Sequence, residues 1–318
     1  MTSTPVNPKT PTLQWRTAAR HGWLPVCAVA LLVAHGAQAQ ESLTLRKIQA
    51  SGSISLGYRD GSVPFSYLDA RQRPIGYSMD LCMHIVDAVK GKVGLPNLEV
   101  KLVPVTTATR IPLVVNDAVD LECGVTTNTV ERQKTVSFTI TTFVAASRLV
   151  SKKSSKVVGF ADLMGRAVVS TVGTTSIRHL AELNLARGLD MKILAGKDDA
   201  EAFKMIETDR AVAYAMDDVL LHSSVASAEN PASYVISEQA LSIEPYGIML
   251  RKGDPAFKRL ADEALVSLFK SGEIRQTYDK WFQSPIPPSS INLRLPMSAA
   301  LRKAIVRPTD SGYPADYE

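Results

Sequence analysis

Hydrophobic and polar positions along this chain follow two periods, and the exchanges between them predict which segments are strands and which are helices. Residues 54–58 (ISLGY) alternate with the period of two typical of a strand, whereas the apolar residues of 78–90 (SMDLCMHIVDAVK) recur at helical spacing. Further strands are predicted at 98–105, 167–172, 191–195, 211–216 and 246–251. Further helices are predicted at 110–118, 173–186, 198–207, 255–270 and 273–282. This alternation predicts an α/β fold with mainly parallel sheets.

Local signals predict several of the element ends. Ser78 is placed as the N-cap of its helix, and Asp198 with Glu201 three residues later has the spacing of a capping box. Residues 151–156 (SKKSSK) predict a solvated loop. Residues 284–290 (SPIPPSS) predict the end of the regular elements, with a tail beyond them.

Polar side chains gather where several predicted strands end. Taken singly, each has a local explanation, because a threonine before a helix usually caps it and an arginine after a strand usually faces water. Their agreement favours a site, since ligands of open α/β sheets bind outside the carboxyl ends of the strands. The groups at these ends are Arg59, Val125–Thr127, Thr174–Thr175 and Asp217.

These groups have the chemistry of a receptor for a zwitterion. Thr126–Asn128 offer neutral donors, and the guanidinium of Arg132 suits a carboxylate. A buried carboxylate needs such partners, because losing its water is costly. Thr174–Thr175 add backbone N–H groups and the positive end of a helix dipole, and Asp217 can hold an ammonium.

Charge gives little support for a polyanionic partner. Of the 36 basic residues, Lys9, Arg16 and Arg20 lie in the first forty residues, which contain no acid. The remaining 33 basic residues face 31 acidic ones, a net charge of +2. We therefore expect no binding of nucleic acid.

The first forty residues have the pattern of a cleavable export signal. Arg16 and Arg20 precede an apolar run, WLPVCAVALLVA, that is shorter than the roughly 20 residues needed to span a bilayer. Ala37-Gln38-Ala39 then offers a small-x-small cleavage site, so residues 1–39 are predicted to be a signal peptide. The mature chain keeps Cys82 and Cys123, which either form a disulfide or are two small buried hydrophobic residues.

Catalytic and metal-binding patterns are weak by comparison. HExxH, GxSxG, P-loop and CxxC motifs are absent, and no spacing supports metal ligation. His84, His179 and His222 fall within helix-like segments without a surrounding motif. We expect no cofactor and no bound metal.

Several stretches together carry a family resemblance. They are YRDGSVPFSYLD, GYSMDLC, RIPLVVNDAVDLECGVTTNTVERQ, VGTTS, AVAYAMDDVLL, EPYGIMLRKGDPAFK and KWFQSPIPP. From about residue 57 to residue 288 the chain resembles the glutamate/aspartate-binding proteins of bacterial ABC importers, within solute-binding protein family 3. The resemblance implies a type II periplasmic binding protein with two lobes that close on an amino acid like a Venus flytrap.

The resemblance also implies an organisation and a partner. Residues 41–145 and 247–318 would form lobe 1, and 146–246 would form lobe 2, inserted between two crossover strands that act as a hinge. Such proteins are not enzymes; they work in the periplasm and deliver their ligand to an ABC permease in the inner membrane. We expect a monomer.

The resemblance assigns roles by position. Arg132 and Thr127 would hold the α-carboxylate of the ligand, with Thr175 reaching it from the other lobe, and Asp217 would take the α-ammonium. The side-chain carboxylate would be surrounded by Arg59, Thr107 and Arg110.

Two positions depart from the family pattern. Val125 stands where the family has serine, so a hydroxyl is lost while the backbone N–H remains. Asp199 stands where the family has a histidine that helps to hold the acidic side chain. An aspartate there would repel a ligand carboxylate or pair with Arg59 or Arg110; alternatively, it only decorates the first turn of its helix.

Other functions stay open from the sequence. An enzyme on the same scaffold, such as a cyclohexadienyl dehydratase, would need a general acid in the cleft, a role that Asp199 could be given. A binding protein that presents its ligand to a chemoreceptor is a second alternative. The preferred ligand, whether glutamate, aspartate or an amide such as glutamine, is also open.

Overall fold

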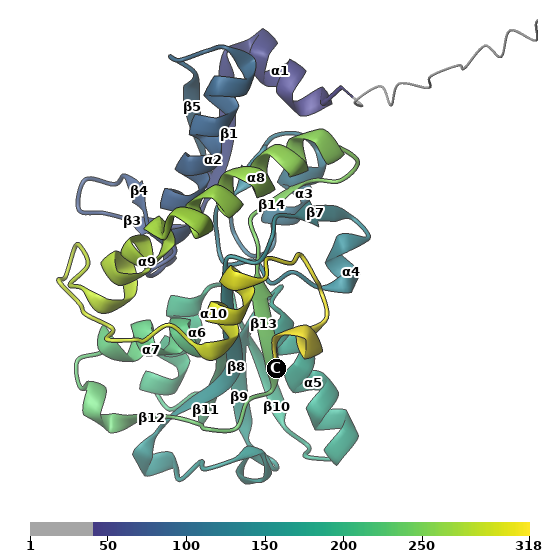
Figure 1. Ribbon diagram of the computed structural model, residues 1–318. Helices are drawn as coiled ribbons and strands as arrows, with labels where there is room; N and C mark the ends of the chain where they lie inside the picture. Colours follow the sequence, from purple (N-terminus) through teal and green to yellow (C-terminus); the bar gives the residue numbers. More distant parts are fainter. Residues whose placement is uncertain (1–40) are drawn as a thin grey trace, which may run out of the picture. The chain divides into compact units, whose positions relative to one another are not determined.

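Two mixed β-sheets organise residues 41–318, which are the residues that the computed structural model describes (Figure 1). In the first sheet β1 pairs in parallel with β5 and β6, and β14 is antiparallel to β6 and β7. Its strands, in spatial order, are β5 (Glu99–Pro104), β1 (Ser53–Tyr58), β6 (Leu121–Glu122), β14 (Met249–Arg251) and β7 (Val136–Phe138). The α/β prediction is confirmed, but the expectation of mainly parallel sheets is wrong, because β8 (Phe143–Lys152) of the second sheet and β14 pair antiparallel with their neighbours.

The second sheet has a parallel half and an antiparallel half. Strands β9, β10 and β11 are parallel, whereas β8 runs antiparallel to β11, β12 and β13. Its strands are β10 (Lys192–Gly196), β9 (Ala167–Thr171), β11 (Ala213–Asp217), β8 (Phe143–Lys152), β12 (Tyr234–Ile236) and β13 (Ser242–Tyr246). A small third sheet contains β2 (Gly61–Ser62), β3 (Ser66–Leu68) and β4 (Pro74–Ile75).

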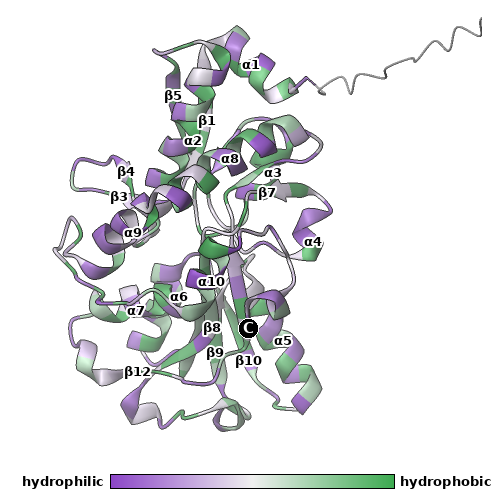
Figure 2. Cartoon of the chain, viewed as in Figure 1, coloured by the Kyte–Doolittle hydropathy of each residue, from purple (hydrophilic) through white to green (hydrophobic). Residues whose placement is uncertain are grey.

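Helices pack along both large sheets through apolar faces. In α8 the buried residues Phe257, Ala261, Leu265 and Leu268 recur at the spacing of one helix face, and this helix packs against α2. In Figure 2 the strands of the second sheet are largely green, whereas the helices show both colours. The α-helices are α1 (Leu43–Ser51), α2 (Tyr77–Val93), α3 (Arg110–Val115), α4 (Val130–Gln133), α5 (Thr175–Arg187), α6 (Asp199–Glu207), α7 (Asp218–Ala226), α8 (Pro255–Ser271), α9 (Glu273–Tyr278) and α10 (Ala299–Val306).

Single turns complete the secondary structure. Four of them are 3₁₀ turns and one, η4, is a π-helical turn that continues α9. They are η1 (Lys153–Ser155), η2 (Phe160–Leu163), η3 (Pro231–Ser233), η4 (Asp279–Gln283) and η5 (Pro314–Tyr317). No helix within residues 41–318 is both long and apolar enough to cross a membrane.

The chain passes between the two large sheets twice, at 139–142 and at 247–248. The two crossings are hydrogen-bonded to each other: Thr139 N donates to Ile248 O (2.9 Å), and Thr142 N donates to Tyr246 O (2.8 Å). The strand predicted at 246–251 is therefore wrong as a single element. Tyr246 ends β13 and β14 begins at Met249, because the chain changes sheets between them.

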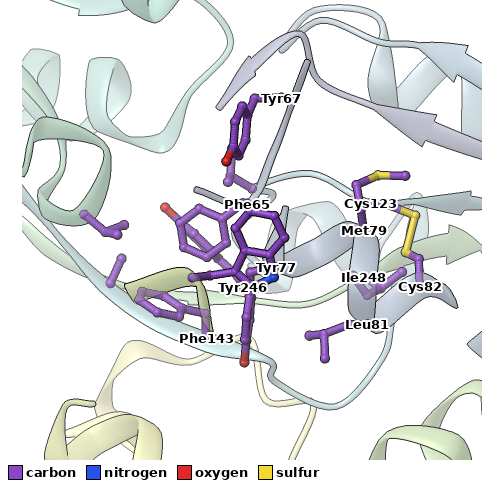
Figure 3. Close-up of a cluster of buried hydrophobic side chains, with 14 of the residues drawn as sticks. Phe65, Tyr67, Tyr77, Met79, Leu81, Cys82, Cys123, Phe143, Tyr246 and Ile248 are labelled. Atoms are coloured by element: carbon purple, nitrogen blue, oxygen red, sulfur yellow. A yellow bond between two sulfur atoms is a disulfide. The ribbon is translucent and has the colours of Figure 1, made fainter. Parts of the chain in front are cut away.

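An aromatic cluster packs beside these crossings (Figure 3). The ring of Phe65 lies edge-on to Phe143 (centroids 4.9 Å apart) and to Tyr246 (5.4 Å). Tyr77 packs against Phe65 and donates its hydroxyl to Thr142 O (2.9 Å). Phe65, which lies on the side of the first sheet, thus contacts Phe143 at the start of β8 and Tyr246 at the end of β13.

Local signals predicted one helix start correctly and another incorrectly. Asp198 caps α6, accepting from Glu201 N (2.8 Å), although the Glu201 carboxylate accepts from Lys197 N rather than from Asp198 N. Helix α2 begins at Tyr77 after Gly76, so Ser78 is not its N-cap. A Cβ on Gly76 would lie 2.2 Å from Phe65 O, so glycine suits this position, and the Ser78 hydroxyl donates to Gly124 O (2.7 Å) instead of capping the helix.

Two further expectations from the sequence are wrong. The loop predicted at 151–156 begins with the last two residues of β8 and continues into η1. The regular elements do not end at 284–290, because α10 follows. Ser298 caps α10 by accepting from Leu301 N (3.1 Å), and Leu301 and Ala304 bury one face of the helix.

A disulfide joins Cys82 of α2 to Cys123, one residue beyond β6 (Figure 3). Both residues are fully buried, and their sulfur atoms are 2.13 Å apart. Of the two alternatives that the sequence left open, the structure has the covalent one. The bond ties helix α2 to the strand that leads into Val125–Thr127.

We predict that removing this disulfide destabilises the protein. The cross-link closes a loop between residues 41 apart, so its loss in a C82A/C123A variant should lower the free energy of unfolding by about 2–4 kcal/mol. Urea unfolding of the oxidised wild type and the double variant measures the difference. Reduced wild-type protein serves as the control for side-chain loss, and equal midpoints for oxidised and reduced wild type would contradict the prediction.

Candidate binding site

A narrow cavity lies between the two large sheets. The nine positions at which the family resemblance placed ligand contacts or departures all line it, together with Met216 and with Thr174, which was predicted at a helix start. The lining residues are Arg59, Thr107, Arg110, Val125, Thr127 and Arg132 from one side and Thr174, Thr175, Asp199, Met216 and Asp217 from the other. Met216 was missed, because an apolar residue inside a strand carries no polar signal.

The ends of parallel strands position most of these groups. Arg59 directly follows β1, and Asp217 is the last residue of β11. Thr174 caps α5 just beyond β9, and Asp199 begins α6 just beyond β10. The two sheets therefore present the carboxyl ends of their strands to one space, as is usual for ligand sites of open α/β sheets.

Gly173 is where the two sides of the cavity meet. Its carbonyl oxygen accepts from Arg110 Nη2 and from Arg132 Nη2, each at 3.3 Å. Gly173 has φ of +76°, and a Cβ there would lie 3.3 Å from Thr107 O. Glycine suits this position because the backbone is left-handed and closely approached.

Arg132 is held at both of its ends. Its backbone N–H donates to Thr129 Oγ1 (3.1 Å), the cap of α4, and Nη1 donates to Thr127 O (2.8 Å). The side chain is half-buried, and Nη2 reaches Gly173 on the other side. Its remaining donor capacity faces the cavity that it lines.

Arg59 and Arg110 are buried with donors left over. Within residues 41–318, neither Arg59 Nη1 nor Arg110 Nε has a hydrogen-bond partner. Burial, together with the positive charge of Arg132 and, to a smaller extent, Arg59, lowers the pKa of Arg110 to about 9. The group stays protonated at neutral pH, so this side of the cavity holds buried positive charge that an anion would stabilise.

The opposite side holds two buried carboxyl groups. Asp217 and Glu244 are 2% and 1% exposed, and Tyr246 donates its hydroxyl to Asp217. Burial raises the pKa of Asp217 well above its usual range, and the charge of Glu244 adds to this. Glu244 accepts from Thr175 Oγ1 (2.7 Å), which leaves the backbone N–H of Thr175 as its donor toward the cavity.

Glu244 was missed among the candidate residues. It lies on β13 behind Thr175 and does not line the cavity, but its charge acts on Asp217. An acid within the apolar stretch SIEPYGIML was the signal that could have revealed it.

Asp199 is both a helix-start residue and a cavity-lining residue. Its Oδ1 accepts from Thr171 Oγ1 (2.7 Å) and from Tyr214 OH (3.0 Å). No ion pair joins it to Arg59 or Arg110 in the described part of the chain. The pairing considered from the sequence is absent, so the negative charge of Asp199 remains at the edge of the cationic side.

Two of the donors predicted for the site turn away from it. Thr126 Oγ1 donates to Glu122 Oε2 (2.7 Å), and Asn128 Nδ2 donates to Asp310 O (2.8 Å). Only Thr127 between them lines the cavity. In extended backbone successive side chains point to opposite sides, so three neighbours cannot all face one space.

For residues 41–318, no group of three side chains has the arrangement of a metal site.

Residues 54–284 match the family described as bacterial extracellular solute-binding proteins, family 3. The chain belongs to this family. It is 49% identical over 268 residues to an L-glutamate/L-aspartate-binding protein of Pseudomonas aeruginosa, covering 84% of this chain and 89% of the relative. It is 45% identical over 267 residues to a glutamate/aspartate import solute-binding protein of Escherichia coli, covering 84% and 88%.

Solved structures agree with this assignment. The crystal structure of a mutant of ArgBP from T. maritima superimposes with a TM-score of 0.68 at 27% identity, covering 76% of this chain and all of that one. The fold is that of the two-lobed type II binding proteins, which confirms the fold that the resemblance implied. The chain is thus a solute-binding protein rather than an enzyme.

We predict that Asp217→Asn stabilises the ligand-free protein. The amide keeps an acceptor for Tyr246 but removes one of two buried charges, and the pKa of Asp217 is raised in the folded state. A raised carboxyl pKa favours folding fully below the unfolded value near 3.8, and this contribution is lost as pH rises through the folded value. The advantage of the variant should therefore be small at pH 4 and grow toward pH 8.

Melting temperatures from pH 4 to 8 measure this difference. Asp209→Asn is the control, because Asp209 is exposed and pairs with Lys152. An advantage of Asp217→Asn that is constant with pH, or that shrinks as pH rises, would show that the buried charge is not its source.

Proposed function

We propose that this protein captures glutamate or aspartate in the periplasm and delivers it to an ABC permease in the inner membrane. The observation that carries the proposal is one cavity that gathers three guanidinium groups on one side and two carboxylates on the other. The curated relatives that bind or import glutamate and aspartate are 45–49% identical to this chain. The proposal therefore rests on site chemistry and on relatedness independently.

The α-carboxylate of the ligand lies between Arg132 and the start of α5. Arg132 offers a charged donor pair, Thr127 a hydroxyl, and Thr175 a backbone N–H at the positive end of the helix dipole. In this arrangement the carboxylate replaces the neutral carbonyl of Gly173 as the principal acceptor for Arg132. Charge-assisted bonds are about twice as strong as neutral ones, so this exchange favours binding.

The α-ammonium binds Asp217. The buried carboxylates of Asp217 and Glu244 oppose each other's ionisation, and a cation beside them relieves that cost. Binding should thus draw Asp217 into its ionised form. The raised pKa of Asp217 is consistent with a carboxyl group that a neighbouring cation would stabilise in its ionised form.

The side-chain carboxylate binds Arg59, Thr107 and Arg110. The two unpartnered guanidinium nitrogens within residues 41–318 belong to Arg59 and Arg110, so an anion here supplies acceptors that the buried donors lack. Val125 contributes its backbone N–H in place of the lost hydroxyl. Asp199 weakens this subsite for a doubly negative ligand, since its charge lies at the same cavity.

Export and assembly complete the proposal. Residues 1–39, which lie outside the described residues, act as the signal peptide, and the Cys82–Cys123 disulfide suits an oxidising compartment. Lobe 1 takes residues 41–145 and 247–318, and lobe 2 takes 146–246, with closure about the two crossings. The protein works as a monomer and uses no cofactor.

Replacing Arg132 tests the proposal most directly. Arg132→Ala removes the charged partner of the α-carboxylate, which every amino acid shares, so binding should weaken on the order of 100-fold or more for all of them. Isothermal titration with glutamate, aspartate and glutamine measures the loss. Arg46→Ala is the control, because Arg46 lies on α1 and is half-exposed. Wild-type affinity in Arg132→Ala would refute the assignment.

Replacing Asp199 tests the side-chain subsite. Asp199→His removes a negative charge that faces the ligand carboxylate, and we expect affinity for glutamate and aspartate to rise by about ten-fold. Asp199→Asn is the matched variant, since it removes the charge and keeps an acceptor for Thr171 and Tyr214. Affinities that both variants leave unchanged would place this position outside the reach of the ligand.

A further inference from the structure

The C-terminal strap, residues 309–317, contacts elements on both sides of the first crossing. It follows α10 and ends in η5, which packs against β13 (Figure 1). Although most of its side chains are exposed, Gly312 and Tyr317 are buried. A segment with a polar exterior and two buried anchors is held by specific contacts rather than by a general apolar face.

One set of contacts holds the segment that carries Arg132. Asp310 O accepts from Asn128 Nδ2 and from Gln133 Nε2, both at 2.8 Å. These two side chains also bond to each other, because Gln133 Nε2 donates to Asn128 Oδ1 (2.8 Å). The backbone of Gly312 packs closely against the same segment, since a Cβ on Gly312 would lie 2.6 Å from Val130 N.

A second set of contacts holds the first crossing between the sheets. Thr141 N donates to Thr309 O (2.8 Å), and the hydroxyls of Thr141 and Tyr317 bond to each other at 2.6 Å. Tyr317 OH also donates to Ser311 O (2.9 Å), which fixes the curve of the strap. The ring of Tyr317 packs with Val144 at the start of β8 and Ala304 of α10.

The strap thus bonds to the Arg132 segment and to the crossing at the same time. Helix α4 is a single turn, and short helices are marginal unless tertiary contacts hold them. Arg132 must reach across the cavity, where its Nη2 already meets Gly173 O of the other side. The angle at the crossing and the position of α4 both affect this reach.

We propose that the C-terminal strap positions Arg132 for ligand capture by fixing α4 relative to the first crossing. The strap touches no ligand itself; Asp310, Gly312 and Tyr317 act through Arg132 and Thr141. This inference rests on the proposed role of Arg132 as the partner of the ligand α-carboxylate. It adds that the strap residues, which are distant in sequence from the residues that line the cavity, determine how fast the ligand dissociates.

Tyr317→Phe tests the strap with the least disturbance. It keeps the buried ring and removes the hydroxyl that bonds to Thr141 and Ser311. We expect glutamate affinity to fall by about five-fold, through faster dissociation in stopped-flow measurements, because the two hydrogen bonds of this hydroxyl are lost. Tyr313→Phe is the matched control, because Tyr313 belongs to the same strap and is 62% exposed.

Hydrogen exchange separates positioning from a merely structural role. In ligand-free Tyr317→Phe, amides of residues 128–133 should lose protection, while those of β9 and β11 keep theirs. A chain that ends at Arg307 removes all strap contacts and should lose at least ten times more affinity than Tyr317→Phe does. Unchanged dissociation and unchanged protection at 128–133 in Tyr317→Phe would overturn the inference, whether or not the shortened chain folds.

The result for Arg132→Ala keeps the two hypotheses apart. If Arg132→Ala binds like wild type, the assignment of the α-carboxylate partner fails, and the strap has no such residue to position. If Arg132→Ala loses binding while Tyr317→Phe matches Tyr313→Phe in affinity and exchange, the proposed function stands and the strap inference is wrong.

Discussion

Charge that is held out of water without full compensation is the constraint on which this structure depends. Three guanidinium groups line one side of the cavity and two carboxyl groups the other, and no ion pair joins Asp199 to Arg59 or Arg110 in the described chain. Each side is costly by itself, as the lowered pKa of Arg110 and the raised pKa of Asp217 indicate. A small zwitterion supplies the opposite charge to each side, so its binding relieves the desolvation penalty of these buried groups and is favourable.

The rest of the fold keeps these groups at their separation. The disulfide holds α2 against the strand that leads into Val125–Thr127, and the aromatic cluster of Phe65, Phe143 and Tyr246 packs the crossings between the sheets. Rigid neighbours matter because side chains that could relax would satisfy one another and leave nothing for the ligand. Preorganised donors avoid that loss and reduce the ordering cost of binding.

Prediction from the sequence succeeded where the signal was local and failed where a distant segment intervened. The cap at Asp198 lies within four residues of its partner and was correct. Ser78 was misplaced as a cap because its hydroxyl donates to the distant Gly124 O, and α10 was missed beyond a proline-rich stretch. Most candidate residues line one cavity, since strand ends in parallel sheets share an edge, but Thr126 and Asn128 turn elsewhere.

The sequence by itself determined the family, the alternation of strands and helices through much of the chain, and which polar residues stand at strand ends, because periodicity and short motifs are local signals that span only a few residues. Only the tertiary structure decided that Cys82 and Cys123 are bonded, that Glu244 raises the pKa of Asp217, and that Asp199 is held by Thr171 and Tyr214. It also decided that the strap reaches α4. These contacts join residues far apart in the chain, and packing in three dimensions, not local preference, brings them together.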